Sequence, residues 1–445
     1  LRGYRFLYQA ITRIHHQAEF SLYDILKQHD ENIFILTKDI NVLQQFVEAN
    51  NRQNIYAELV PHANRERVLS FARQHNLPVV ASNAVFFVHK NDWQTHQLLR
   101  AIDLNTSLER VPADELAHPD AWFKSAAEMT ALFADCPDAL SNTLEIAQSC
   151  EFHLDFGDFV FPSFPDAGDQ DIFDFLCDSV KNGIRKRYGN ITDAIQERLN
   201  YELDIIRDKG FSAYFLVLAD VAKKVKLTCG RGSAAASIVS YALGITHVDP
   251  IKHNLFFERF LNRGRKDPPD IDVDFAWDER DTVLKYLFEK YGPEHTAMIS
   301  NHTTLKARAA VREIAKVHGL ADGEIGAITK KMNSYWQPND LWDMTQNHPI
   351  YKETEFTDTW KEIIQRAESI RGYPRNMSVH CGGVVIAPDR LDNYVPFQPA
   401  KKVLLLADAL ADGSAGSLSF TTDNNSVNVV QWEKNQAEDM KLVKM

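Results

Sequence analysis

The sequence predicts a multidomain α/β protein, and three observations support that fold class. The chain has 445 residues, enough for about two to four domains of ordinary size. Its 44% hydrophobic and 25% charged residues are typical of globular proteins and not of disordered ones. Short apolar runs of the kind found in buried strands alternate with helical stretches through residues 1–105.

Hydropathy and cysteine content exclude several classes of protein. No apolar run approaches the roughly 18 residues that a membrane helix needs, so no membrane association is expected. The five scattered cysteines form no Cys-x-x-Cys pair, which favours reduced thiols in the cytoplasm over a disulfide framework or a zinc ribbon. The chain begins with Leu1 and has no secretory signal, so we expect it to be a piece of a longer polypeptide.

The net charge of −12 fails the simple whole-chain test for a nucleic-acid-binding protein. Any contact with DNA must therefore come from local basic clusters. The sequence contains three of them: Lys223, Lys224, Lys226 and Arg231; Arg259, Arg263, Arg265 and Lys266; and Arg308, Arg312 and Lys316.

The predicted elements follow in order along the chain. Buried strands are expected at 32–36, 55–60 and 77–81, and helices at 112–150, 193–209, 283–291, 304–318 and 322–375. The helix at 193–209 has its apolar residues on one face and Gly210 at its C-terminal cap. The turn-rich segment 162–168 predicts a domain boundary, and the low-complexity segment 411–419 predicts a loop.

The carboxylates at 270–275 carry the strongest chemical signal. Asp270, Asp272 and Asp274 alternate strictly with apolar residues, which predicts a strand with three carboxylates on one face. Like charges on one face repel, and Mg²⁺ is the usual compensation because it prefers carboxylate oxygens and substrate phosphates. An exposed acidic edge strand is the alternative. A calcium loop is rejected, because Phe275 stands where it needs glycine and Asp281 where it needs glutamate.

A glycine-rich turn precedes this strand. Gly230, Arg231, Gly232 and Ser233 lead into an alanine-rich stretch that Gly244 ends. We expect Ser233 to cap a helix whose amides, with Arg231, bind an anion. No Gly-Lys-Ser/Thr follows, so the turn is not a Walker A loop. Together with the carboxylate strand it predicts a nucleotidyl-transfer site, in which the turn holds a triphosphate and the strand holds two metal ions.

Several segments resemble the C-family bacterial DNA polymerases, the DNA polymerase III alpha subunits. They are Gly230–Ser233, Leu255–Asn262, Pro269–Phe275, Arg375–Pro388 and Gln431–Lys444. Within the family, the sequences of these segments are most similar to those of the error-prone branch. The resemblance is nearly continuous from about residue 200 to 400.

The resemblance implies site residues on a palm of the polymerase beta type. Asp270 and Asp272 match the aspartates that hold two Mg²⁺ ions, and Asp274 is a neighbour that supports them. The residues expected to bind the nucleotide or its phosphates are Arg231, Gly232, Ser233, Arg259 and Lys444.

The resemblance also divides the chain into parts. They are the back half of a PHP-like domain at 1–105, a helical connector at 106–165, the palm at 166–300, a helical thumb at 301–377 and a return to the palm at 378–445. The chain stops before the third catalytic aspartate and lacks the fingers, so we expect this fragment to be inactive alone. Ala84-Val85-Phe86 replaces the Asp-x-His of metal-binding PHP domains, and segment 403–425 does not follow the family.

The function implied is that of a template-directed DNA polymerase core in replication, repair or translesion synthesis. Its partners would be primer–template DNA, a dNTP and, through regions outside this chain, a sliding clamp and other replisome subunits. Arg308, Arg312 and Lys316, at i, i+4 spacing on one helix, would face the phosphates of the duplex. Two alternatives remain: a non-templated nucleotidyltransferase, and a non-catalytic DNA-binding paralogue.

Overall fold

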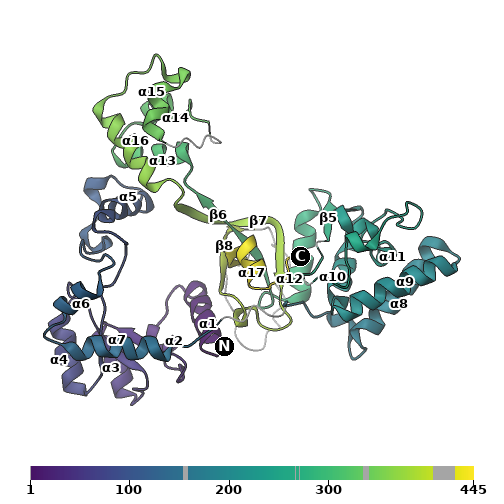
Figure 1. Cartoon of the computed structure of the whole chain (residues 1–445), viewed down its shortest axis with the longest axis horizontal. Helices are drawn as coiled ribbons and strands as arrows, with labels where there is room; N and C mark the ends of the chain where they lie inside the picture. The colour runs from purple at the N-terminus through teal and green to yellow at the C-terminus, as the bar shows by residue number, and fades with distance from the viewer. Residues whose placement is uncertain (1, 154–158, 266, 270, 334–339, 404–425) are drawn as a thin grey trace. The chain divides into compact units, whose positions relative to one another are not determined.

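The computed structural model describes residues 2–153, 159–265, 267–269, 271–333, 340–403 and 426–445 (Figure 1). It separates into two compact units. Unit 1 comprises Leu1–Phe20, Leu154–Asn301 and Ser378–Met445, and unit 2 comprises Ser21–His153 and His302–Met377. Both strands and helices are abundant, so the predicted mixed α/β class is confirmed.

One part of unit 2 is a parallel three-stranded sheet. Its strands are β1 (Ile35–Thr37), β2 (Ile55–Leu59) and β3 (Val79–Ala81), in that order. These are the strands expected at 32–36, 55–60 and 77–81, with the first shifted by a few residues. The helices of this part are α2 (Leu22–Leu26), α3 (Ile40–Glu48), α4 (Arg65–His75), α6 (Ala126–Leu132) and α7 (Pro137–Ser149). Helix α7 lies against β3, where Asn142 donates to the Val79 carbonyl at 2.7 Å.

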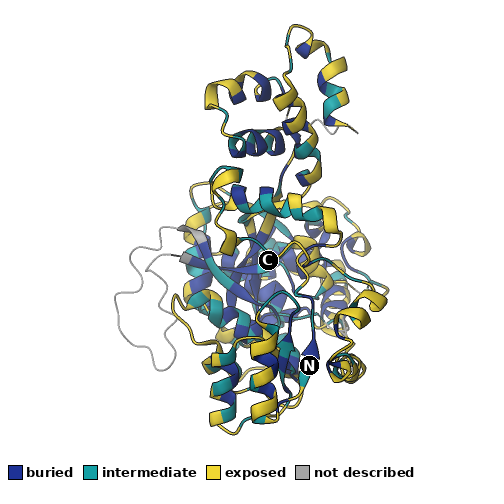
Figure 2. Ribbon diagram, turned by 90° about the vertical axis from the view of Figure 1, so that its left-hand side faces the viewer, coloured by how far each residue is buried: buried dark blue, intermediate teal, exposed yellow. Residues whose placement is uncertain are grey.

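The other part of unit 2 is a helical cluster. It contains α5 (Trp93–Asp103), α13 (Ala307–Val317), α14 (Asp322–Thr329), α15 (Leu341–Asn347) and α16 (Asp358–Ile370). Each of the larger helices has one buried and one exposed face (Figure 2). Val311, Ile314, Ile363 and Ile364 form the centre of a common core, to which α5 adds Leu98. The expected helices at 304–318 and within 322–375 are confirmed.

A four-stranded sheet of order β7-β6-β9-β8 lies mostly in unit 1, whose limits at Asn301 and Ser378 fall within β6 and β7. The strands are β6 (Thr296–Thr304), β7 (Pro374–Ile386), β8 (Phe397–Val403) and β9 (Ser426–Glu433), with β6 parallel and β8 antiparallel to β9. Helix α1 (Arg2–His16) packs against β8, where the Phe397 amide donates to Thr12 Oγ1 at 3.3 Å. Helix α17 (Lys434–Asp439) directly follows β9.

The remainder of unit 1 is mostly helical. Its helices are α8 (Ile172–Tyr188), α9 (Asp193–Asp208), α10 (Ser212–Ala222), α11 (Ile238–Leu243) and α12 (Arg280–Tyr291). Helices α8 and α11 cross closely at Gly183. A Cβ at this position would lie only 2.0 Å from the Ala242 carbonyl oxygen, so glycine is needed there. The expected helices at 193–209 and 283–291 are confirmed as α9 and α12. A two-stranded antiparallel sheet, β4 (Thr228–Arg231) and β5 (Asp272–Phe275), completes this region.

Within the described residues, no helix is both long and apolar enough to cross a membrane. All five cysteines are free thiols. Predicted features that fall on residues 404–425, including the loop at 411–419, lie outside the described residues.

Candidate active site

The predicted carboxylate strand is β5, and it pairs with the strand that carries the glycine turn. In the antiparallel register, Arg231 lies opposite Asp272 and Cys229 lies opposite Asp274. Alternate residues share a face of a strand, so Arg231, Cys229 and both aspartates lie on one face. Arg231 Nη1 is 3.5 Å from Asp272 Oδ2, and its Nε is 3.1 Å from an Asp274 carboxylate oxygen. Asp270 lies outside the described residues.

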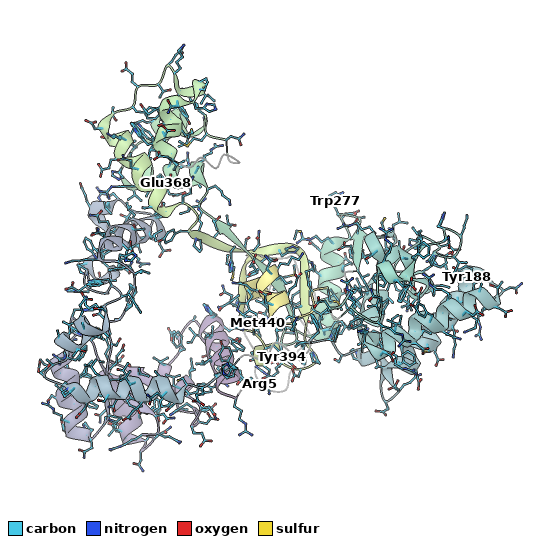
Figure 3. All side chains as sticks on the ribbon, viewed as in Figure 1. Arg5, Tyr188, Trp277, Glu368, Tyr394 and Met440 are labelled. Carbon is cyan, nitrogen blue, oxygen red and sulfur yellow. The ribbon has the colours of Figure 1, made fainter. Side chains whose placement is uncertain are left out.

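The positive charge of Arg231 compensates the repulsion between the Asp272 and Asp274 carboxylates. The hydrogen bond to Asp274 and the charge of Asp272 raise the pKa of Arg231 above its ordinary value. The side chains of Arg231, Asp272 and Asp274 are each about half exposed. A cation from solvent can therefore replace the Arg231 guanidinium beside the two carboxylates. Trp277, two residues past the end of β5, points away from the ribbon and is 91% exposed (Figure 3).

The glycine turn begins where β4 ends. Gly232 has a φ of +68°, a left-handed conformation that favours glycine, and it starts the 3₁₀ turn η5 (Gly232–Ala236). A Cβ on Gly232 would lie 3.9 Å from Asp272 Oδ2. The structure therefore brings the predicted phosphate-binding turn directly beside the predicted metal-binding carboxylate.

The expectation that Ser233 caps a helix is wrong. Ser237 is the cap, and its Oγ accepts from the Ser240 amide at 3.1 Å. The cause is Glu202 of α9, whose carboxylate accepts the Ile238 and Val239 amides at 3.1 and 3.2 Å. These are the first free amides of α11, so that helix begins at Ile238 and its N-terminus already holds a carboxylate. An anion bound here must use the amides of η5 instead. The end of α11 at Gly244 is as predicted.

Arg259 is the last residue of a second 3₁₀ turn, η6 (Phe257–Arg259). Phe257 is fully buried and fixes the turn to the interior, while Arg259 is exposed. Arg198 of α9 donates to the Ala236 carbonyl at 2.8 Å and to the Leu255 carbonyl at 2.9 Å. One guanidinium therefore links the end of η5 to the residue two positions before η6.

Lys444 is half-buried and forms an antiparallel bridge with Val385. It lines a cavity of about 730 Å³ together with Pro268 and Pro269, the residues that precede the carboxylate run. Lys434 and Lys441 line the same cavity. Burial and the nearby charges of Lys444 and Lys434 lower the pKa of His380.

The predicted DNA-binding residues lie on α13 in unit 2. Arg308 is exposed, whereas Arg312 and Lys316 are half-buried and bonded within the unit. Arg312 Nη2 lies 2.9 Å from Asp322, and Lys316 Nζ lies 3.5 Å from Glu313. The three side chains share the helix face opposite the buried Val311 and Ile314, as their spacing predicts.

The donor set on β5 fits a hard divalent cation. Asp272 and Asp274 offer carboxylate oxygens on one face, which Mg²⁺ prefers, and the Arg231 guanidinium shows that this face attracts a cation. The described residues, which exclude Asp270, contain no cluster of three or more His, Cys, Asp or Glu side chains arranged to hold a metal.

Sequence reasoning missed Arg198 and Glu202. A signal was present, because helical spacing places Glu202 three residues after Leu199 and thus on the apolar face of α9. A carboxylate at such a position must be paired when the helix packs.

A glycine turn and a carboxylate strand, joined by one antiparallel strand pair, define the class: a mixed α/β protein whose candidate site places a turn with free amides beside carboxylate oxygens. The particular family follows from sequence comparison. Residues 174–445 match the model of the bacterial DNA polymerase III alpha NTPase domain, and the chain belongs to the DNA polymerase III alpha family.

Individual relatives agree with this assignment. The chain is 36% identical over 354 residues to the DNA polymerase III subunit alpha of Bacillus subtilis, a match that covers 78% of this chain and 31% of the relative. It is 34% identical over 379 residues to the Vibrio cholerae subunit, covering 79% and 32%. For the Escherichia coli K12 subunit the values are 34% over 349 residues, 74% and 30%. The chain spans about a third of the length of these relatives.

Proposed function

We propose that this chain contains the palm of a template-directed DNA polymerase, which joins a dNTP to a primer 3′-hydroxyl. The observation that carries the proposal is the position of Gly232 against Asp272, across paired strands. Membership of the DNA polymerase III alpha family supports it.

Each site residue then has a chemical role. Asp270 and Asp272 would hold two Mg²⁺ ions, which activate the attacking hydroxyl and stabilise the leaving pyrophosphate. The amides of the Gly232–Ser233 turn would receive triphosphate oxygens. Arg231, Arg259 and Lys444 would neutralise the remaining phosphate charge. Arg231 would leave Asp272 and Asp274 when it binds phosphate.

The other parts of the chain would serve the same reaction. Arg308, Arg312 and Lys316 would bind duplex phosphates without reading sequence. The proposal includes the domain limits and the PHP-like character of 1–105. It also includes the inactivity of the chain alone and its role in replication or in translesion synthesis. Clamp and other replisome partners would bind elsewhere in a polymerase of full family length.

Primer extension tests the proposal. In a polymerase of full family length that carries this chain, Asp272→Asn should reduce Mg²⁺-dependent extension by about 100-fold or more, the scale at which losing one electrostatic catalytic group is felt. Asp278→Asn removes an exposed carboxylate in the turn after β5 and is the matched control. Extension without a template would favour a non-templated nucleotidyltransferase. Equal extension by the wild type and Asp272→Asn would overturn the assignment of this carboxylate.

A further inference from the structure

Helix α9 contains a carboxylate that is wholly enclosed and fully satisfied. Glu202 accepts from Ser237 Oγ at 2.8 Å and from the Ile238 and Val239 amides, and none of its side chain is exposed. Burial raises the pKa of Glu202, whereas the Ile238 amide and Arg198 act in the opposite direction. Because every partner is a donor, the surroundings are built for the ionised carboxylate.

Arg198, one helical turn earlier, uses its planar fork to bind three partners. Its Nε donates to Glu202 Oε1 at 2.7 Å. Its Nη2 donates to the carbonyls of Ala236 and Leu255. Ala236 ends η5 and Leu255 shortly precedes η6, so the side chain fixes one turn relative to the other. A lysine has a single ammonium and cannot reproduce this geometry.

The same helix contacts η6 through two further interactions. The Arg198 guanidinium lies 5.8 Å from the Phe257 ring centroid. The Tyr201 ring centroid lies 6.1 Å from the same Phe257 centroid. Burial and a hydrogen bond to Glu258 raise the pKa of Tyr201. Arg198, Tyr201 and Glu202 thus connect one rigid helix to both turns that carry the candidate phosphate-binding residues.

We propose that Arg198 and Glu202 are positioning residues, which hold the Gly232–Ser233 turn and the Arg259 turn at the separation that one nucleoside triphosphate requires. The inference rests on the proposed function. It adds a pair that touches no substrate and acts through the backbone of both turns. Turn amides bind phosphate oxygens only when they converge on them, so loss of this support should appear first in nucleotide affinity.

Equilibrium binding of dATP with Mg²⁺ to the 445-residue chain tests the proposal, together with amide hydrogen exchange. Arg198→Lys keeps the charge but removes the fork, and should weaken dATP binding by about tenfold. Glu202→Gln places a side-chain amide, itself partly a donor, against four hydrogen-bond donors. It should weaken dATP binding by about tenfold or more. Arg207→Lys, an exposed change on the same helix, is the matched control and should bind dATP like the wild type.

Hydrogen exchange separates positioning from general support of the fold. Arg198→Lys should speed exchange at the amides of both η5 and η6 and leave the β6 and β9 amides protected. Faster exchange throughout unit 1, or at only one of the turns, would overturn the proposal. Glu202→Gln can unfold the region outright, and Arg198→Lys then decides alone.

Two further variants distinguish failure of this inference from failure of the proposed function. Gly232→Ala and Arg259→Ala alter the turns themselves. If both bind dATP as tightly as the wild type, or the wild type does not bind it, the proposed phosphate site is wrong and the positioning role fails with it. If both weaken binding and Arg198→Lys does not, only the positioning role is wrong.

Discussion

Arg231 and Asp272 face each other across β4 and β5, with Nη1 of the arginine 3.5 Å from Oδ2 of the aspartate. The same guanidinium binds Asp274. A residue expected to bind phosphate is thus the counterion of the carboxylates expected to bind metal. Metal and arginine compete for these oxygens, and a triphosphate would offer the arginine an alternative partner.

Arg231→Gln should therefore change the affinities for metal and for nucleotide in opposite directions. Mg²⁺ should bind about two- to fivefold more tightly, a small change because exposed ion pairs are weak. Nucleotide with Mg²⁺ should bind more weakly, because a phosphate partner is lost. Calorimetric titration of the chain with Mg²⁺ alone, and then with dATP and Mg²⁺, measures both.

Lys226→Gln is the control for this experiment, since it removes an exposed cation just before β4 without touching the carboxylate face. Unchanged Mg²⁺ affinity in Arg231→Gln would show that the guanidinium does not compete with the metal.

Gly230 fixes β4 against the segment that follows α11. A Cβ at this position would lie 2.5 Å from the Ile245 carbonyl oxygen and 2.9 Å from Thr246 Cβ. Gly230→Ala should therefore destabilise the protein by about 1–3 kcal/mol, the usual cost of overpacking. Urea unfolding measures the change.

The control for Gly230 is Gly323→Ala in α14, where a Cβ meets nothing within 4 Å. Because alanine favours a helix more than glycine, this change should stabilise by about 0.5–1 kcal/mol. A Gly230→Ala protein as stable as the wild type would show that β4 can move away from Thr246.

Periodicity predicted some of the regular elements well. The helix at 193–209 and the parallel strands appear with nearly the expected bounds, because their apolar spacing is set by local geometry. Strand β4 was missed, since Gly230 and Arg231 carry no strand signal. Only its pairing with β5, about 40 residues later, makes it a strand.

The helix cap was misplaced for a related reason. Ser233 and Ser237 give similar local signals, each preceding small or apolar residues. The choice is made by Glu202, which is 35 positions away from Ser237 and bonded to it. A contact at that separation cannot be inferred from a local pattern. For this reason the shared face of Asp272 and Asp274 was predictable, whereas the support of the glycine turn was not.

His318, after the end of α13, should make unit 2 sensitive to acid. Burial lowers the pKa of His318 below its ordinary 6.5, and its buried Nε2 has no hydrogen-bond partner among the described residues. The unfolded chain then binds the proton first, so stability decreases as pH falls through about 6.5 and below. His318→Gln should flatten the dependence of the melting temperature on pH between about 7 and 5.

The matched variant for this prediction is His75→Gln, at the half-buried last residue of α4 in the same unit. It should leave the slope of melting temperature against pH unchanged. Equal slopes for the wild type and His318→Gln would mean that protonation of His318 is not linked to unfolding.

Cys229 offers a chemical probe of the candidate site, because its exposed thiol lies opposite Asp274 on the carboxylate face. N-ethylmaleimide should modify it readily, and dATP with Mg²⁺ should slow that reaction at least severalfold by covering the face. Cys150 is also exposed but follows α7 in unit 2, so its modification in the same sample should be unaffected by nucleotide. Mass spectrometry of the two peptides measures both rates.

Cys229→Ser should retain dATP binding, because the thiol is a neighbour of the site and not a ligand. Equal protection of both cysteines would indicate a general tightening of the protein, and no protection of either would place the nucleotide away from β4 and β5.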